Sequence, residues 1–470
     1  MDCPVQATLT HDPALAPASP SASEELSLLV RLAVPLAAAN LGQTLIGAVD
    51  TAVVGRLGTV ELGAAGLGNS VFFTVTVLGM GVMLGLDPLI AQAVGANEPT
   101  RARRTLWQGV WLALGLGVPL CVAVVLLGSL LERFGIDAAT AEHTRDYVYA
   151  RVWGLAPFLV FVALRGYLQA VSSTRPVVVA VVVANVINLP LSWALVFGDA
   201  GLTSLGLPAL GVPRMGVAGA AWASTLCTLL QMAVLAVGVR RLTRGAEHGV
   251  RRPVAPLMKK ALLLGTPIGL QLLAEFGVFS LVNVLMGNLD ARSLAAHQVA
   301  ITIASATFMV PVGIGAATSV RVGQAVGRAD ITGTRRAGVT GIAVGMAFMV
   351  CAATAFLLLP RLLAGIITDE IDVIEAVVPL LFVAAVFQLS DGVQAVAAGA
   401  LRGAGDTRFP LLANLGGHYL VGLPLGVALG FGLGLGARGL WWGLSAGLTC
   451  VAVALALRFW HASSRPIARA

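Results

Sequence analysis

The chain has 470 residues, of which 57% are hydrophobic and only 11% are charged. Soluble domains carry about 25% charged residues, so this composition excludes an ordinary water-soluble globular protein. The formal net charge of +7 does not indicate nucleic-acid binding, because the basic residues stand singly or in pairs between apolar runs instead of forming one dense basic face.

The first segment, residues 1–26, is rich in Ala, Pro and Ser and contains no Lys or Arg. A secretory signal needs a basic start followed by an apolar core, and this segment has neither. We therefore expect residues 1–26 to form a disordered cytoplasmic tail.

Twelve apolar segments follow, each near the length of roughly 20 residues that a membrane-spanning helix needs. The apolar runs are unbroken instead of alternating, which predicts helices and not the strands of a barrel. Several contain Pro, as at Pro35 and Pro267, which spanning helices tolerate when neighbouring helices or water satisfy the freed carbonyls. The segments lie near residues 28–52, 62–86, 105–131, 146–171, 177–198, 215–239, 258–284, 294–320, 337–363, 373–401, 409–432 and 438–460.

Lys and Arg gather in alternate connections between these segments. The connection after the second segment carries Arg101, Arg103 and Arg104, whereas the connection before the tenth carries acidic residues such as Asp369 and Glu370. The positive-inside rule therefore places both termini in the cytoplasm and predicts a multi-pass protein of the inner cell membrane.

The chain repeats itself at an offset of 232 residues, since Gln92–Gly95 and Gln324–Gly327 share the sequence Gln-Ala-Val-Gly. We infer two six-helix halves. Six is even, so both halves enter the membrane from the same side and are related by a pseudo-two-fold axis along the membrane normal. A cleft between such halves can open to either side by rocking. The predicted parts are an N-terminal bundle over 27–239, a basic cytoplasmic linker over 240–257, a C-terminal bundle over 258–461 and a cytoplasmic tail over 462–470.

Three acidic residues lie where the segments should be surrounded by lipid. Glu275 and Asp391 fall inside the seventh and tenth segments, and Asp50 falls at the end of the first. An ionised side chain at mid-membrane costs about 2.5–3.5 kcal/mol on insertion scales, and no Lys or Arg lies in the central turns of the seventh or tenth segment. Such a carboxyl can hold a proton or a sodium ion until another cation displaces it. Asp87, near the end of the second segment, is better explained as a structural acid.

Asn185, Asn188 and Ser192 form a polar stripe on one side of the fifth segment. These residues would either link helices or coordinate an ion through their oxygens, and the sequence leaves both open.

In the second half, Asn283 and Gln394 are the candidate polar supports for the acids. Phe276, Phe279 and Phe387 are candidate aromatic residues of a cavity for an amphiphilic guest. Aromatic residues at helical spacing nevertheless more often serve packing than ligand contact.

Signatures of enzymes and of ATP-driven pumps are absent from the sequence. It contains no P-loop, no Gly-rich dinucleotide-binding turn, no HExxH and no GxSxG. None of its five cysteines pair with ligand-like spacing. We expect no enzymatic activity, no cofactor and no metal apart from a coupling ion, so that uphill transport draws on an ion gradient or on voltage.

Five stretches of the chain carry a resemblance to a known family: Val49–Gly58, Ala91–Gly95, Ala295–Gln298, Arg321–Gly327 and Ala397–Thr407. Together they resemble the multidrug and toxic compound extrusion (MATE) family, specifically its bacterial NorM-like branch, over about residues 28–460. The resemblance implies a V-shaped pair of bundles that exchange small organic cations and drugs for protons or sodium ions. On that pattern Asp50 matches the coupling acid of the N-terminal bundle with Asn188 as its partner amide, and Glu275 and Asp391 match the cation-site acids of the C-terminal bundle.

The chain departs from the family pattern at two positions. It has Ser192 where relatives carry Asn or Asp, and Phe387 where a sodium-site Tyr is familiar. Each departure removes an oxygen or a charge. The sequence therefore allows either H+ or Na+ as the coupling ion, with sodium at Glu275 and Asp391.

One alternative from the same superfamily is a flippase for lipid-linked oligosaccharide precursors, whose anionic headgroups would favour interior Arg or Lys. An ion channel is disfavoured because the acids do not repeat between the halves, Glu275 corresponding to Gln43 and Asp50 to Val282. A membrane enzyme would need a nucleophile and base that the chain lacks. The sequence thus predicts a cation-coupled drug exporter that acts as a monomer in the lipid bilayer.

Overall fold

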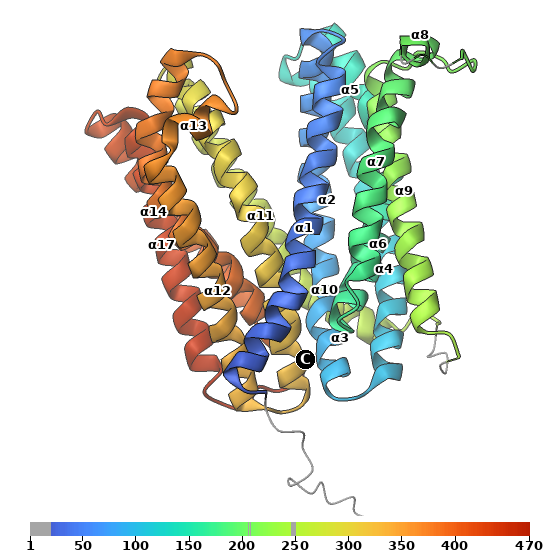
Figure 1. Ribbon diagram of the computed structural model, residues 1–470, viewed down its shortest axis with the longest axis vertical. Coiled ribbons are helices and arrows are strands. Elements are labelled where there is room, and N and C mark those ends of the chain that lie inside the picture. The colour runs from blue at the N-terminus through green and yellow to red at the C-terminus, as the bar shows by residue number, and fades with distance from the viewer. Residues whose placement is uncertain (1–19, 205, 207, 246–250) are drawn as a thin grey trace, which may run out of the picture.

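The computed structural model describes residues 20–204, 206, 208–245 and 251–470, and every regular element within them is a helix. The described helices form twelve segments that are long and apolar enough to cross a membrane, and some of these segments consist of helices joined end to end. The twelve predicted spans and the all-α fold are therefore confirmed. Figure 1 shows the helices as two bundles, one from each half of the chain.

The first bundle contains six spans and one short surface helix. They are α1 (Ala22–Val54), α2 (Thr59–Leu84) with α3 (Leu86–Gly95), α4 (Pro99–Ser129), α5 (Ala138–Arg151) with α6 (Leu155–Ala170), α7 (Arg175–Phe197), the short α8 (Asp199–Ser204) and α9 (Val217–Leu242).

The second bundle has the same order of spans. They are α10 (Ala255–Gly287), α11 (Ala291–Gly327), α12 (Ile331–Leu358), the short α13 (Pro360–Gly365), α14 (Ile371–Ala404), an eleventh span from α15 (Arg408–Asn414) to Gly432, and α17 (Gly436–Ala462). The eleventh span contains two π-helical stretches, η4 (Leu415–Gly422) and η5 (Ala428–Gly432), on either side of α16 (Leu423–Val427). Such wide turns occur frequently at functional sites.

The start of α1 corrects the predicted extent of the N-terminal tail. The helix begins at Ala22 and not after residue 26, because Ser21 and Glu24 form a capping box. The Ser21 hydroxyl accepts a hydrogen bond from the Glu24 amide, and the Glu24 carboxylate accepts one from the Ser21 amide at 2.7 Å. This pairing satisfies two backbone donors that would otherwise be left without partners at a helix start. Residues 1–19 lie outside the described residues.

The predicted linker is also shorter in the structure. Helix α9 extends to Leu242 and α10 begins at Ala255, so each enters the predicted 240–257 linker by three residues. Residues 246–250 of this linker lie outside the described residues. At the other end of the chain α17 stops at Ala462.

The first helix of each bundle packs against the opposite bundle. Helix α1 packs on α11, and α10 packs on α2, while each also contacts its own bundle through α7 and α15 respectively. Helices α2 and α10 meet at Gly81 and Gly269, where a Cβ on Gly81 would collide with the Gly269 backbone. In lipid, helices associate through such close van der Waals contact and not through the hydrophobic effect. This exchange of first helices is the contact pattern that a two-fold relation between the halves requires.

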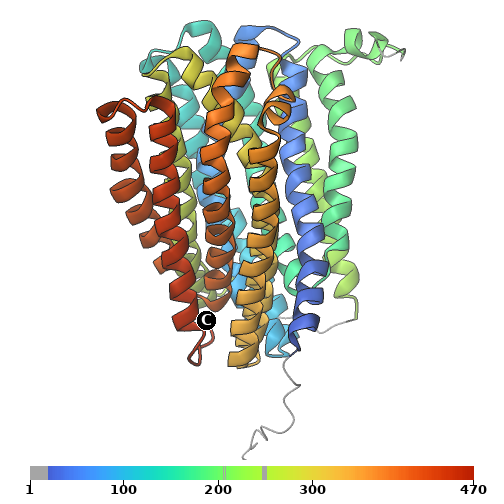
Figure 2. The same cartoon turned by 60° about the vertical axis from the view of Figure 1, so that its left-hand side comes forward.

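The repeated Gln-Ala-Val-Gly sequence forms reciprocal contacts between the bundles, which we call the seam. Gln92 donates from Nε2 to the carbonyl of Gly403 at 3.1 Å, and Gln324 donates from Nε2 to the carbonyl of Ala170 at 2.9 Å. A Cβ on Gly95 would collide with the carbonyl oxygen of Gln324, and one on Gly327 with that of Gln92. The seam lies at the end of the molecule where α1 begins and α17 ends, shown at the bottom of Figures 1 and 2. We call this the terminal end.

Two ion pairs, one buried and one partly buried, also join the bundles at the terminal end. Arg321 of α11 donates from Nε and Nη2 to the two carboxylate oxygens of Glu25 in α1, at 2.8 and 2.5 Å. Asp87 of α3 lies 3.8 Å from Nε of Arg402 in α14, and the charge of Arg165 also acts on it. Asp87 thus lies in a structural ion pair, the role that the sequence favoured for it.

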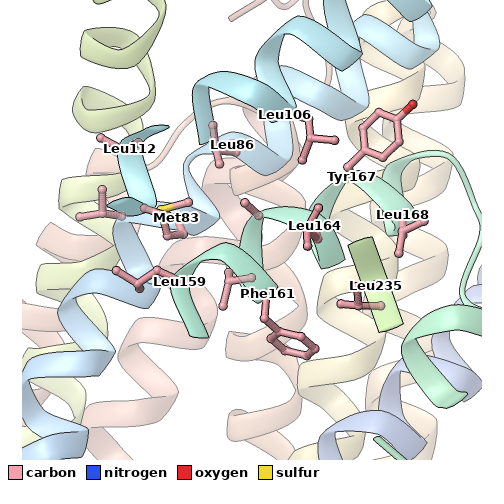
Figure 3. Close-up of a cluster of buried hydrophobic side chains, with 14 of the residues drawn as sticks. Met83, Leu86, Leu106, Leu112, Leu159, Phe161, Leu164, Tyr167, Leu168 and Leu235 are labelled. Atoms are coloured by element: carbon pink, nitrogen blue, oxygen red, sulfur yellow. The ribbon is translucent and has the colours of Figure 1, made fainter. Parts of the chain in front are cut away.

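Next to the seam, large apolar side chains fill the interior of the first bundle, as Figure 3 shows. They come from α2, α3, α4, α6 and α9, so one cluster fixes five helices relative to one another. Its labelled members are Met83, Leu86, Leu106, Leu112, Leu159, Phe161, Leu164, Tyr167, Leu168 and Leu235. This packing provides the rigid body against which the polar residues of the bundle are held.

The seam glycines lead to a first prediction. We expect Gly95→Ala and Gly327→Ala each to destabilise the protein by about 1–3 kcal/mol, because the added Cβ forces a packed backbone contact apart. Thermal unfolding in detergent measures the change. The matched control is Gly115→Ala in α4, where a Cβ would have nothing within 4 Å. Equal midpoints for all three variants and the wild type would show that the seam is not closely packed.

A second prediction concerns Glu25. Glu25→Gln leaves the Arg321 guanidinium without its counter-charge in a buried position, so we expect a loss of about 3–5 kcal/mol in unfolding free energy. The control is Glu375→Gln, which breaks the exposed pair between Glu375 and Arg361 at 2.9 Å and should leave the unfolding midpoint unchanged. If both substitutions have the same effect, the Glu25–Arg321 pair does not stabilise the fold.

Candidate functional site

The first bundle holds Asp50 in a pocket of hydrogen-bond donors that we call the first-bundle site. Asp50 lies one turn before the end of α1 and is 8% exposed. Asn188 of α7 donates from Nδ2 to its Oδ1 at 3.1 Å, and the Ser224 hydroxyl of α9 donates to its Oδ2. Ser192 is fully buried beside Asp50, and its hydroxyl has no hydrogen-bond partner within the described part of the chain. Three helices therefore converge on one carboxylate.

The polar stripe on α7 divides into two roles. Asn188 binds the Asp50 carboxylate, whereas Asn185 donates from Nδ2 to the backbone carbonyls of Gly42 and Val181, both at 2.9 Å. The first of these bonds links α7 to α1. Asn185 therefore links two helices, the first of the alternatives that the sequence left open, and coordination of an ion by Asn188 or Ser192 stays a prediction.

Sequence reasoning missed the basic residue of this site. Arg151, the last residue of α5, places its guanidinium over the ring of Phe72 at 4.6 Å and donates from Nη1 to the Thr228 hydroxyl at 3.5 Å. Its charge acts on Asp50. The available signal was an arginine inside the fourth apolar segment, because charged residues within spans are rare and usually functional. Ser224 carried no comparable signal, since serine is common at helix contacts.

The second bundle places its two predicted acids close together, in what we call the second-bundle site. Glu275 of α10 accepts a hydrogen bond at Oε2 from Asn414 Nδ2 of α15 at 3.4 Å, and Gln394 of α14 lies beside it. Asp391, one turn before Gln394, is 6% exposed and interacts electrostatically with Glu275. Across the described ranges, neither acid forms an ion pair with a basic side chain. The site therefore combines two like-charged groups with no cation to compensate them.

The second-bundle site also contains acceptor oxygens with no donor. In the part of the chain that the structure describes, Gln394 Oε1 and Asn414 Oδ1 are buried without hydrogen-bond partners. Hard cations prefer such carboxylate and amide oxygens as ligands. No group of three or more His, Cys, Asp or Glu side chains suited to a metal occurs among the described residues. The donor set thus fits a proton or a single alkali cation better than a transition metal.

The wide turns of the eleventh span position Asn414 and its neighbours. The π-helical stretch η4 follows directly after Asn414, and its Tyr419 hydroxyl donates to the carbonyl of Ala274 at 2.8 Å, next to Glu275. His418 is fully buried one turn after Asn414, and neither ring nitrogen has a partner among the residues described. The irregular eleventh span therefore places the side chains of Asn414 and Tyr419 next to Glu275 of the seventh span.

One predicted polar support and one predicted aromatic residue make their contacts away from Glu275. Asn283 is about two turns from Glu275 along α10, and its Oδ1 accepts a hydrogen bond from Gln298 at 2.7 Å, which links α10 to α11. Phe387 is 2% exposed and packs edge-on against Phe279 and Trp441, with ring centroids 6.2 and 5.7 Å away. Asn283 thus contributes to a helix contact, and Phe387 packs with Phe279, which is partly buried. The roles predicted for these three residues at a binding site stay predictions.

Phe276 has a different position. Its ring lies 5.4 Å from that of Phe73 in α2, so this aromatic pair joins the two bundles one residue away from Glu275. Of the three aromatic candidates, Phe276 is the one whose contacts cross between the bundles next to an acid.

Comparison with known families identifies both halves of the chain. The MatE family model matches residues 35–194 and again residues 267–428. The two matches begin at Pro35 and Pro267, at the same offset that relates the two Gln-Ala-Val-Gly stretches.

Curated relatives match nearly the whole chain. A probable multidrug resistance protein NorM of Deinococcus radiodurans is 39% identical over 93% of this chain and 96% of its own length. One of Bradyrhizobium diazoefficiens is 37% identical over 93% of each chain. The multidrug resistance protein NorM of Burkholderia vietnamiensis is 36% identical over 96% of this chain and 97% of its own.

Solved structures share the fold. A multidrug resistance MATE family transporter of the MOP superfamily in an outward-facing conformation superposes with a TM-score of 0.84 at 20% identity, over 94% of this chain and 96% of that one. The eukaryotic MATE transporter AtDTX14 superposes with a TM-score of 0.80 at 24% identity, over 93% and 96%. At these identities the likeness establishes the arrangement of helices and no more.

The second-bundle site leads to a third prediction. Asp391→Asn removes one of two like charges that lack a basic partner, so we expect it to stabilise the protein by roughly 1–3 kcal/mol in alkaline buffer without sodium, the size of an uncompensated buried polar group. The gain should shrink in mildly acidic buffer, where a proton already compensates the pair. Thermal unfolding of both proteins measures it, with the exposed-loop variant Asp369→Asn as the control. A loss of stability in alkaline buffer would show that Asp391 is already compensated.

Proposed function

The chain belongs to the MatE family of membrane transporters and is not an enzyme, and on this premise we propose that it is an antiporter. In this proposal it exports small organic cations, multiple drugs among them, in exchange for protons or sodium ions. The family needs no cofactor, so the coupling ion provides the driving force. The relatives' names, which describe multidrug resistance proteins, support drugs as the class of substrate.

One observation carries the proposal: Glu275 and Asp391 lie together in a membrane-spanning bundle, and no basic side chain among the described residues pairs with either of them. Two ionised carboxyls in this position are unfavourable until a cation joins them. A proton, a sodium ion or an organic cation each satisfies that requirement. Because all three compete for the same negative charge, entry of one favours departure of another, and this competition is the basis of exchange.

Asp50 with Asn188 and Ser192 forms a second protonation or substrate site in this scheme. Its carboxylate is held by donors from α7 and α9, so the geometry of the site depends on how these helices sit against α1. A change in the charge of Asp50 would weaken or strengthen these hydrogen bonds. The first bundle could thereby adjust the position of α1, which packs against the second bundle.

The direction of transport follows from the predicted topology. With both termini in the cytoplasm of a cell whose inner membrane holds the protein, the terminal end faces the cytoplasm. The seam then closes the cytoplasmic side in the described arrangement. Alternating access requires the contacts of Gln92 and Gln324 to separate as the bundles rock, and the reciprocal geometry of the seam lets both halves release together. A monomer suffices for this cycle.

The flippase alternative is less well supported. Its anionic substrate would need several interior Arg or Lys, but the second-bundle site presents acids, and Arg151 is the basic residue at the first-bundle site. The relatives' names also favour drug export. We therefore retain the organic-cation antiporter as the proposal.

The test is efflux of the organic cation ethidium from proteoliposomes with an imposed sodium gradient or an imposed pH gradient, in turn. We expect wild-type efflux to respond to at least one gradient. Asp391→Asn should reduce gradient-driven efflux at least about 100-fold, because a neutral side chain no longer distinguishes a site that holds a cation from an empty one. The control is Asp369→Asn, in an exposed loop, which should transport as the wild type does. Full efflux by Asp391→Asn would exclude the second-bundle site as the coupling site.

A further inference from the structure

Asp50 and Arg151 are two opposite charges inside the first bundle that do not form an ion pair. No contact of 4.0 Å or less joins them among the described residues, although the charge of Arg151 acts on Asp50. Ionised side chains within spans normally pair with one another. In the same structure Glu25 and Arg321 do so with two close hydrogen bonds. The separation of Asp50 from Arg151 therefore needs an explanation.

Arg151 rests on weak contacts. Its guanidinium carbon lies 4.6 Å from the centroid of the Phe72 ring, and Nη1 donates to the Thr228 hydroxyl at 3.5 Å, a long distance for a hydrogen bond. Gly154 leaves space beside it, since a Cβ there would lie 2.9 Å from Nη1. Arg151 also forms a side-chain hydrogen bond with the Tyr147 hydroxyl. A cation–π contact and hydrogen bonds to neutral hydroxyls hold a guanidinium less firmly than a carboxylate does.

The resting place of Arg151 is one helical turn from the Asp50 carboxylate. The Thr228 hydroxyl donates to the carbonyl of Ser224 at 2.8 Å, and the Ser224 hydroxyl in turn donates to Asp50. Side chains four residues apart on a helix are about 5–6 Å apart. A change in the side-chain rotamer of Arg151 is therefore the movement that we expect to bring its guanidinium to the Asp50 carboxylate.

We propose that Arg151 is a built-in counter-cation for Asp50. When Asp50 has lost its proton or bound cation, the guanidinium leaves Phe72 and Thr228 and pairs with the carboxylate. When a proton or a cationic substrate occupies Asp50, Arg151 returns to Phe72. Arg151 is thus a positioning residue that competes with substrate, and it keeps the first bundle electrically compensated in its empty state. This inference rests on the proposed function, in which Asp50 holds an exchanged cation.

The two sites differ in the way this proposal needs. Arginine keeps its charge throughout the physiological range, so Arg151 is a permanent cation. The second-bundle site has no such group in the described part of the chain and must obtain its positive charge from solution. The titratable groups that interact electrically with Asp50 are Arg151 and Tyr147 of α5 and Cys227 of α9. Of these, Arg151 alone is a cation.

The first test measures equilibrium binding of the organic cation tetraphenylphosphonium to the purified protein in detergent. We expect Arg151→Gln to bind the probe about tenfold more tightly than the wild type, roughly 1.4 kcal/mol, because an internal competitor is gone. In an Asp50→Asn background the same substitution should change nothing. Unchanged or weaker binding by Arg151→Gln, or an equal gain in the Asp50→Asn background, would overturn the proposal.

Two further variants separate charge from structure. Thr228→Val keeps the volume but removes the resting hydrogen bond, so Arg151 spends more time on Asp50 and probe binding should weaken about two- to threefold. Arg151→Lys keeps the charge and should restore affinity towards that of the wild type. A purely structural role for Arg151 predicts that all three substitutions weaken binding together, which would contradict competition.

A second readout does not depend on transport. Infrared difference spectra can follow the carboxylic-acid C=O band of Asp50, identified by its absence in Asp50→Asn. At one alkaline pH this band should be stronger in Arg151→Gln than in the wild type, because without its counter-cation Asp50 retains its proton. A stronger band together with absent ethidium efflux by the wild type would reject the proposed function but keep the Arg151–Asp50 pair. Unchanged bands with normal efflux would reject the pair alone.

Discussion

The absence of water inside a membrane is the constraint from which the polar architecture of this protein follows. Each buried charge must find a partner in the protein or obtain one from solution. At the terminal end the requirement is met permanently, by Glu25 with Arg321 and by Asp87 with Arg402. At Glu275 and Asp391 it is not met by any described side chain. The same physical rule therefore produces fixed ion pairs between the bundles at the terminal end, and at Glu275 and Asp391 a site that needs a cation from solution.

The internal repeat is found at the seam and not at the first-bundle and second-bundle sites. Gln92 and Gln324 make equivalent hydrogen bonds to opposite bundles, because two bundles related by a pseudo-two-fold axis meet through equivalent surfaces. The acids have no such counterparts, since Glu275 corresponds to Gln43. Symmetry is thus kept at the seam, where the proposed rocking would take place, and lost at the two candidate sites. An exporter that exchanges unlike ions benefits from both properties.

Much of the fold could be predicted from the sequence because its signals are local. Twelve apolar runs, alternating basic loops and a repeated tetrapeptide gave the spans and the two halves, and the capping box at Ser21 was also present to be found. The site was predicted less completely because contacts between helices depend on how the helices are rotated. Asn283 meets Gln298 and Phe387 meets Trp441 through such rotations, which no spacing along one helix reveals. Arg151 differs from these residues, because its signal, an arginine inside the fourth apolar segment, is visible in the sequence.

The charge balance of the two bundles has a consequence for the driving force. If Arg151 compensates Asp50, the first-bundle site carries no net charge when it is empty and one positive charge when Asp50 holds a proton, because the guanidinium keeps its charge. The second-bundle site changes its charge with each ion that enters or leaves. Moving one charge through the membrane potential is worth about 2.3 kcal/mol per 100 mV. Each site thus changes by one charge when it takes up a proton, and the two sites differ in their empty state, which is neutral at Asp50 with Arg151 and negative at Glu275 with Asp391. In the proposed cycle, α1 is the element that connects the two sites, because it carries Asp50 and packs on both bundles.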